Sequence, residues 1–125
     1  MMSPYAPLHV ALNVSDLAQA EAFYGGVLGL PRGDRPLAFP GQWYQIGDFQ
    51  IHLIVAERVR QPPQATEKWG RHAHLALAVA DLEATAVALA QAGCPVQRSA
   101  SGRAALFTQD PDGNVIELTA MPPGS

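Results

Sequence analysis

The sequence predicts an α+β fold built from two copies of one βαβββ module, and three observations predict it. With 125 residues, of which 48% are hydrophobic, the chain has the size of one domain with a single core. Residues 8–17, LHVALNVSDL, align with residues 73–82, AHLALAVADL, at an offset of 65 with six of ten identical, and QIHL at 50–53 falls on VIEL at 115–118 at the same offset. Alternating apolar residues are followed in each copy by a helical spacing. We therefore expect an eight-stranded mixed sheet with helices on its outer face.

The first module spans about residues 7–56. Strict alternation predicts a strand over 8–14, and apolar residues three and four apart predict a helix over 16–28, with Ser15 or Asp16 as its N-cap and Gly29 as its stop. Three shorter strands complete the module, at 35–39, 42–46 and 49–55, with Gly47 and Asp48 in the last turn.

The second module spans about residues 72–120 and follows the same order. It has a strand over 72–79, a helix over 81–92 between Asp81 and Gly93, and strands at 96–99, 103–109 and 114–119. The intervening residues 57–71 are polar, contain two prolines and have no sustained period, so we expect them to be the linker between the modules.

Composition narrows the class of protein. The formal charge is -3, and the eight basic residues are scattered, so no basic stripe favours nucleic acid or an anionic bilayer. The longest apolar run is too short to cross a membrane, and the N-terminus lacks the pattern of a signal peptide. The single cysteine, Cys94, forms no internal disulfide. We expect a cytoplasmic protein that binds a small molecule.

Four potential metal ligands share the face of the sheet that points away from the helices. Alternation along four strands places His9, His52, His74 and Glu117 there, in positions related pairwise by the repeat. Three imidazoles and a carboxylate suit one divalent Fe, Ni, Zn, Co or Mn ion. For any one of the histidines taken alone, the alternative is an ordinary hydrogen-bonded or exposed side chain.

From residue 8 to residue 119 the sequence resembles the glyoxalase, bleomycin-resistance and extradiol-dioxygenase superfamily, also called the vicinal oxygen chelate superfamily. The resemblance lies in HVALNVSDLAQAEAFYGGVLGL, IHLI, RHAHLALAVADLEATAVALAQAG and FTQDPDGNVIEL. It implies paired modules in a U-shaped sheet, a homodimer and a divalent metal held by His9, His74 and Glu117, with His52 at the variable fourth position. The ligands of one site belong to one chain or are shared between two.

The same resemblance implies several reactions and leaves them open. A metal would bind two adjacent substrate oxygens, with Glu117 or a bound hydroxide as base. Glyoxalase I enzymes carry Glu or Gln where this chain has His52, and glutathione-using bacterial ones a basic residue where it has Asn13. No arginine follows Glu117 as in fosfomycin-modifying relatives, whereas the two-His, one-carboxylate set suits a ring-cleaving dioxygenase.

We therefore expect a metal-dependent lyase or isomerase of glyoxalase type, and a ring-cleaving dioxygenase is the second choice of enzyme class. The alternative is a non-catalytic binding protein of the bleomycin-resistance type. Four residues are candidate substrate contacts: Asn13, His72, Trp43 and Trp69. The alternative is that these side chains only pack or cap. Three arginines could hold an anionic substrate: Arg71, Arg98 and Arg103. The alternative is that they are exposed and solvated, as most arginines are.

Overall fold

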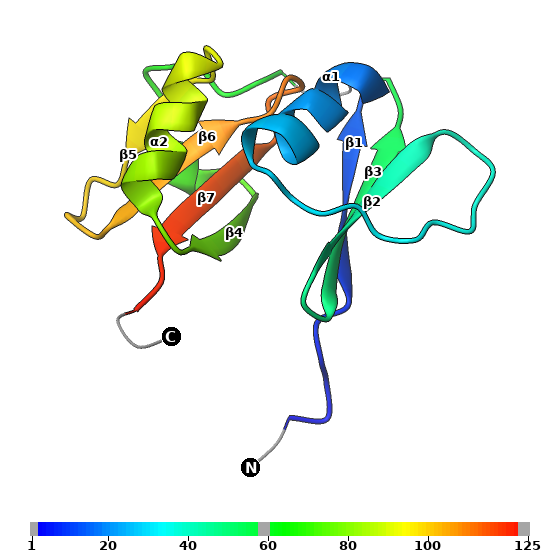
Figure 1. The fold of residues 1–125 in the computed structure, drawn as a ribbon. Coiled ribbons are helices and arrows are strands. Elements are labelled where there is room, and N and C mark those ends of the chain that lie inside the picture. Colours follow the sequence, from blue (N-terminus) through cyan, green and yellow to red (C-terminus); the bar gives the residue numbers. More distant parts are fainter. Residues whose placement is uncertain (1–2, 58–60, 123–125) are drawn as a thin grey trace. The chain divides into compact units, whose positions relative to one another are not determined.

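The computed structural model describes residues 3–57 and 61–122, and it divides into two compact units, Met1–Arg58 and Val59–Ser125. Figure 1 shows their elements in chain order. Each unit contains a small sheet and a helix, which confirms the α+β class and the two repeated modules.

The first unit contains a three-stranded sheet in the order β1-β3-β2. Its strands are β1 (His9–Val14), β2 (Gly41–Ile46) and β3 (Phe49–Val55), with β1 parallel and β2 antiparallel to β3. The helix begins as α1 (Leu17–Glu21) and continues as the π-helical η1 (Ala22–Val27). The expected N-cap is confirmed, because the Asp16 carboxylate accepts a hydrogen bond from the Gln19 N–H.

The expected strand over 35–39 is wrong, so the described residues contain seven strands and not eight. Pro36 lies within this segment and Pro40 follows it, and both lack the N–H donor that a ladder needs. The segment bonds to itself instead: the Arg35 guanidinium donates to the Leu37 carbonyl and lies 4.7 Å from the centre of the Phe39 ring.

The second unit contains a four-stranded sheet in the order β4-β7-β6-β5. Its elements are η2 (Trp69–Arg71), β4 (His74–Val79), α2 (Leu82–Gln91), β5 (Val96–Arg98), β6 (Ala105–Gln109) and β7 (Val115–Ala120). Asp81 caps α2 by accepting from the Ala84 N–H, and Gly93, at φ 75°, ends it. Both expectations are confirmed.

Residues 61–71, part of the expected linker, pack on the second unit, while 58–60 lie outside the described residues. The Trp69 side chain is buried with Phe107 and Val115. The Gln109 amide donates to the Pro63 carbonyl, and Pro62 lies against Gly113. This segment is therefore held in place beside β6 and β7.

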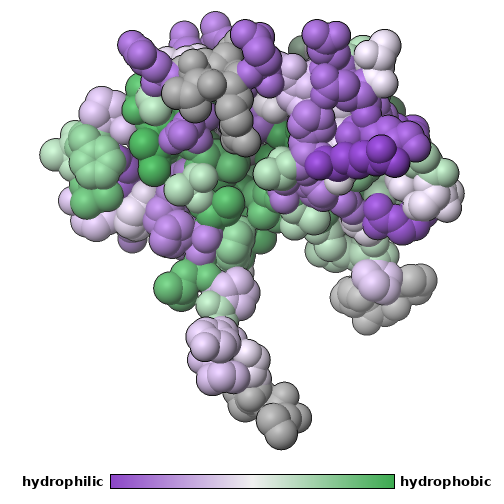
Figure 2. Space-filling view, turned by 180° about the vertical axis from the view of Figure 1, so that it is seen from behind, coloured by the Kyte–Doolittle hydropathy of each residue, from purple (hydrophilic) through white to green (hydrophobic). Residues whose placement is uncertain are grey.

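Each unit has its own apolar core under its helix. Phe23, Tyr44 and Ile51 are buried in the first unit, and Leu89, Leu106 and Ile116 in the second. Other large apolar side chains stay exposed, among them Phe39, Ile54 and Val87, and Figure 2 shows green apolar areas among the purple polar ones. Within the described residues, no helix has the length and apolarity that crossing a bilayer requires.

Candidate functional site

Glu117 and His74 meet on the face of the second sheet that does not carry the helix. Glu117 lies on the central strand β7, opposite Ala76 of β4, and His74 is two residues before Ala76. This diagonal brings His74 Nε2 to 3.1 Å from Glu117 Oε1. Two of the four predicted ligands are thus brought together by strand register alone.

The protonation of His74 follows from its other ring nitrogen. Nδ1 lies 2.7 Å from the backbone carbonyl oxygen of His72, and a carbonyl can only accept, so Nδ1 carries the hydrogen and donates it. In the neutral ring Nε2 is then a lone pair that faces a carboxylate oxygen. At 3.1 Å this contact requires a proton between Nε2 and Oε1, and the same two atoms could serve as ligands to a metal ion that replaces the proton.

The Glu117 carboxylate is buried and held at both oxygens. Oε2 accepts from the Thr119 hydroxyl at 3.0 Å and from the Arg103 guanidinium at 3.3 Å. Burial alone would raise the pKa of Glu117, but the hydrogen bonds from Thr119 and Arg103 and the charges of Arg103 and His74 outweigh it, and the pKa lies below its ordinary value. The group is therefore an anion at neutral pH.

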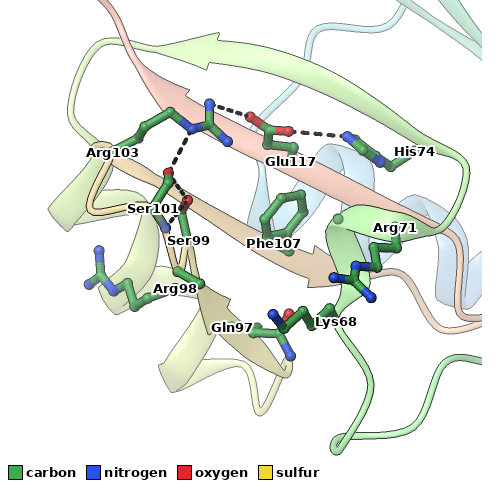
Figure 3. A pocket seen from close by; sticks show the side chains of 12 residues that line it. Lys68, Arg71, His74, Gln97, Arg98, Ser99, Ser101, Arg103, Phe107 and Glu117 are labelled. Atoms are coloured by element: carbon green, nitrogen blue, oxygen red, sulfur yellow. Dashed lines mark hydrogen bonds and ion pairs between the residues drawn. The ribbon is translucent and has the colours of Figure 1, made fainter.

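A cavity of about 430 Å³ opens beside this pair, within the second unit. His74, Glu117 and Phe107 line it from the sheet, and Phe107 meets the His74 ring edge to face at 5.4 Å between centroids. Figure 3 shows basic and hydroxyl side chains disposed around Phe107: Lys68, Arg71, Arg98, Arg103, Ser99 and Ser101. The volume lies in the range of small-molecule sites.

The other two predicted ligands, His9 and His52, form an aromatic stack in the first unit. Their rings are parallel, with centroids 4.0 Å apart, and Trp43 stacks on the opposite face of His52 at 4.1 Å. Since Gln50 Oε1 accepts, the His52 Nε2 at 2.8 Å donates, which leaves its Nδ1 as the lone pair. Burial lowers the pKa of His52, and the charges of His9 and Arg35 lower it further.

Stacked imidazoles cannot bind one ion as they stand. A ligating lone pair lies in the plane of its ring, and two parallel planes about a ring thickness apart share no point at which a metal could sit. Among the residues that the structure describes, no three His, Cys, Asp or Glu side chains are grouped to hold an ion. The four predicted ligands therefore form two pairs, one within each unit. Of these pairs, only His74 and Glu117 turn their donor atoms towards each other.

The four predicted substrate contacts lie in different surroundings. Asn13 is exposed on β1, and Trp43 is half-buried in the stack. The His72 ring pairs with Glu67 at 2.7 Å, while its backbone carbonyl orients His74. Trp69 is buried, and its indole N–H donates to the Gln64 carbonyl. Its neighbours Lys68 and Gly70 line the cavity, whereas Trp69 itself does not. Contact of these four with a substrate stays a prediction.

Sequence reasoning missed several residues that line the cavity, among them Lys68 and Phe107. Phe107 is buried on β6 and is paired with Glu117, so the register could have identified it. Lys68 belongs to a segment without periodicity, and nothing in its sequence marks it as part of a cavity.

Comparison with known proteins agrees with this fold. The sequence model of the Glyoxalase/Bleomycin resistance protein/Dioxygenase superfamily matches residues 6–118. A solved structure from Bacillus anthracis assigned to the glyoxalase family is 23% identical, with a TM-score of 0.76 over 97% of this chain and 100% of that one. No curated protein sequence matches this chain significantly.

Two further solved structures share the fold at low sequence identity. Lactoylglutathione lyase from Agrobacterium tumefaciens is 23% identical, with a TM-score of 0.68 over 95% of this chain and 96% of that one. The fosfomycin resistance protein FosX from Listeria monocytogenes is 14% identical, with a TM-score of 0.70 over 100% and 96%.

Proposed function

The chain belongs to the Glyoxalase/Bleomycin resistance protein/Dioxygenase superfamily, and from this premise we propose that it is a divalent-metal-dependent enzyme of glyoxalase type. It acts as a lyase or isomerase, with a ring-cleaving dioxygenase as the variant for iron, on a small substrate that chelates the metal through adjacent oxygens. The observation that carries the proposal is the pair of His74 and Glu117, an imidazole with a fixed tautomer beside an ionised carboxylate, because both groups are common ligands of divalent ions.

The geometry of this pair suits a metal. Imidazole nitrogens and carboxylate oxygens both ligate divalent ions such as zinc. The separation between Nε2 and Oε1 is 3.1 Å, so the two groups lie close enough to hold one ion together. Nδ1 of His74 donates a hydrogen bond to the His72 carbonyl. Histidines that bind metals usually make such a bond, which orients the ring and fixes its tautomer. His9 and His52 are the proposed remaining donors, and Fe, Ni, Zn, Co and Mn are the candidate ions.

A bound divalent ion would supply electrostatic stabilisation of the negative charge that develops on a substrate oxygen. Glu117 is the proposed base, through Oε2, which faces Thr119 and Arg103. Because its pKa is lowered, it is ionised and ready to accept a proton, but it is a weak base. The proton that it removes must therefore belong to an acidic position of the substrate.

Metal analysis of untagged protein tests the assignment. We expect about one ion per site, lost in His74→Ala and Glu117→Ala and retained in His72→Ala, a matched control because only the His72 backbone carbonyl contacts His74. Equal metal content in all variants would refute the ligand role. Bound iron leads to oxygen-uptake assays with catechols, and bound nickel or zinc to hemithioacetal isomerisation.

Metal loading also makes a prediction about the first unit. If His9 and His52 become ligands, their rings must rotate out of the stack, and the indole of Trp43 loses its imidazole partner. We expect a change in Trp43 fluorescence on titration with the metal in a Trp69→Phe background. An unchanged spectrum at full metal occupancy would exclude these two histidines from the ligand set.

A second candidate, a metal-free binding protein, is favoured by one observation. With a proton on His74, both oxygens of Glu117 are already satisfied by protein donors, from His74, Thr119 and Arg103. Failure to bind any of the five ions after reconstitution would select this function. In either case we propose a homodimer, and light scattering that gives a single 13.3 kDa species at micromolar concentration would contradict it.

A further inference from the structure

We propose that the cavity of the second unit binds a small organic oxyanion, a carboxylate or a phosphate ester, through Lys68 and Arg71. The inference rests on the proposed function, because it takes the cavity beside His74 and Glu117 as the substrate site. It adds the charge class of the substrate and the residues that select it.

The lining of the cavity carries an excess of positive charge. Four basic residues but only one carboxylate, that of Glu117, line the cavity, although the whole chain has a formal charge of -3. Two of the four are already paired: Arg98 makes two hydrogen bonds of 2.9 Å to Glu83, and Arg103 contacts Glu117. Two positive charges remain.

These two charges belong to Lys68 and Arg71. Neither forms an ion pair with an acidic side chain in the part of the chain that the structure describes. Both are exposed at the rim of the cavity, where a ligand can reach them (Figure 3). A neutral or cationic ligand would leave this charge uncompensated, whereas an anion would form charge-assisted hydrogen bonds with it.

The backbone that carries Lys68 is fixed on both sides by one side chain. Gln97 Oε1 accepts from the Trp69 N–H at 2.9 Å, and Gln97 Nε2 donates to the Glu67 carbonyl at 2.8 Å. The Arg71 N–H closes the turn on the Lys68 carbonyl at 3.1 Å. Both cations thus project from an anchored turn, which reduces the entropy lost when they bind a ligand.

The rest of the cavity indicates how a substrate lies in it. The floor is Phe107, which packs so closely on Gly70 that a Cβ there would approach the ring to 2.8 Å. His74 and Glu117 line the same cavity. A substrate with its anionic group on Lys68 and Arg71 would place its carbon skeleton over Phe107 and its reacting oxygens towards His74 and Glu117.

Calorimetric titration with phenyl phosphate tests the inference on chelator-treated protein. We expect saturable binding that weakens with added salt and weakens about tenfold or more in the Lys68→Gln, Arg71→Gln double variant. Each single variant should show part of the loss. Arg32→Gln, which removes an exposed arginine from the first unit, is the matched charge control and should bind as the parent does.

Two results would overturn the inference: phenyl phosphate binding that is absent or unaffected by the double variant, or equal binding of uncharged benzyl alcohol. Amide shifts of Gly70 and Gln97 in NMR spectra verify the place of binding and the fold of each variant. Because the titration contains no metal, a failure of the metal proposal leaves it unchanged. Conversely, metal bound without anion binding would refute only the charge selection.

Discussion

Replacing Gly113 by alanine should destabilise the second unit and loosen the segment that carries Lys68 and Arg71. Gly113 has φ +85°, and a Cβ added there would lie 2.5 Å from Cβ of Pro62 and 2.8 Å from its Cα. The left-handed conformation costs an alanine about 1–2 kcal/mol. Relief of the contact by movement of Pro62 costs about 1–3 kcal/mol more, as for other overpacked sites. The expected loss of unfolding free energy is therefore about 2–5 kcal/mol.

Gly102 provides the matched control. It has φ +78°, and a Cβ added there would meet nothing within 4 Å, so Gly102→Ala should lose only the conformational part, about 1–2 kcal/mol. Urea unfolding followed by Trp69 fluorescence in a Trp43→Phe background reports on the second unit. Equal losses in the two variants would refute the packing of Pro62 on Gly113. A larger loss for Gly113→Ala, together with weaker phenyl phosphate binding, would support it.

The remaining predictions concern titration. Arg103→Gln should raise the pKa of Glu117, because a hydrogen bond and a positive charge that lower it are removed, and a carbon-13 titration that shows no rise would contradict this. Since the folded pKa of Glu117 lies below its ordinary 4.5, its ionisation stabilises the fold above that pH, and this contribution is lost as pH falls through the folded pKa. Glu117→Gln should therefore show a shallower fall in urea midpoint under acid conditions than the parent. His52 also has a lowered pKa, so stability should decline as pH falls below its ordinary 6.5, and His9→Phe, which keeps an aromatic partner, should raise the pKa of His52 in proton NMR titrations.

Much of the fold follows from local signals in the sequence. Period-two alternation located β1 and β4, and the carboxylates of Asp16 and Asp81 located the helix starts within one residue. The strand predicted over 35–39 was wrong, because the apolar residues there suggest a strand while the prolines and the contacts of Arg35 stabilise a loop. The π-helical turn of η1 also has no signature in periodicity, since it is a matter of hydrogen-bond geometry.

The sequence could predict those parts of the candidate site whose positions follow from the strand register. Alternation placed His74 and Glu117 on one face, and parallel pairing of β4 with β7 brought them together. Arg71 was a candidate contact for an anionic substrate, but alternation could not place it or Lys68 beside His74 and Glu117, because the turn that carries them is held by the side-chain amide of Gln97. A contact between residues about 30 positions apart, made by a side chain with a backbone, leaves no periodic trace.

The repeat also explains why the two halves of the predicted ligand set behave differently. The strand register is the same in both units: Ala11 is paired with His52 as Ala76 is with Glu117. At these equivalent positions the first unit has a ring with a lowered pKa, which stacks between His9 and Trp43. The second has a carboxylate that is ionised and faces the lone pair of a histidine with a fixed tautomer. The second pair can therefore accept a cation without a change of rotamer, whereas the first must break its stack. Under the proposed function, His74 and Glu117 are therefore expected to bind an ion before His9 and His52 do, and the cost of unstacking these two histidines is expected to lower the affinity for the ion.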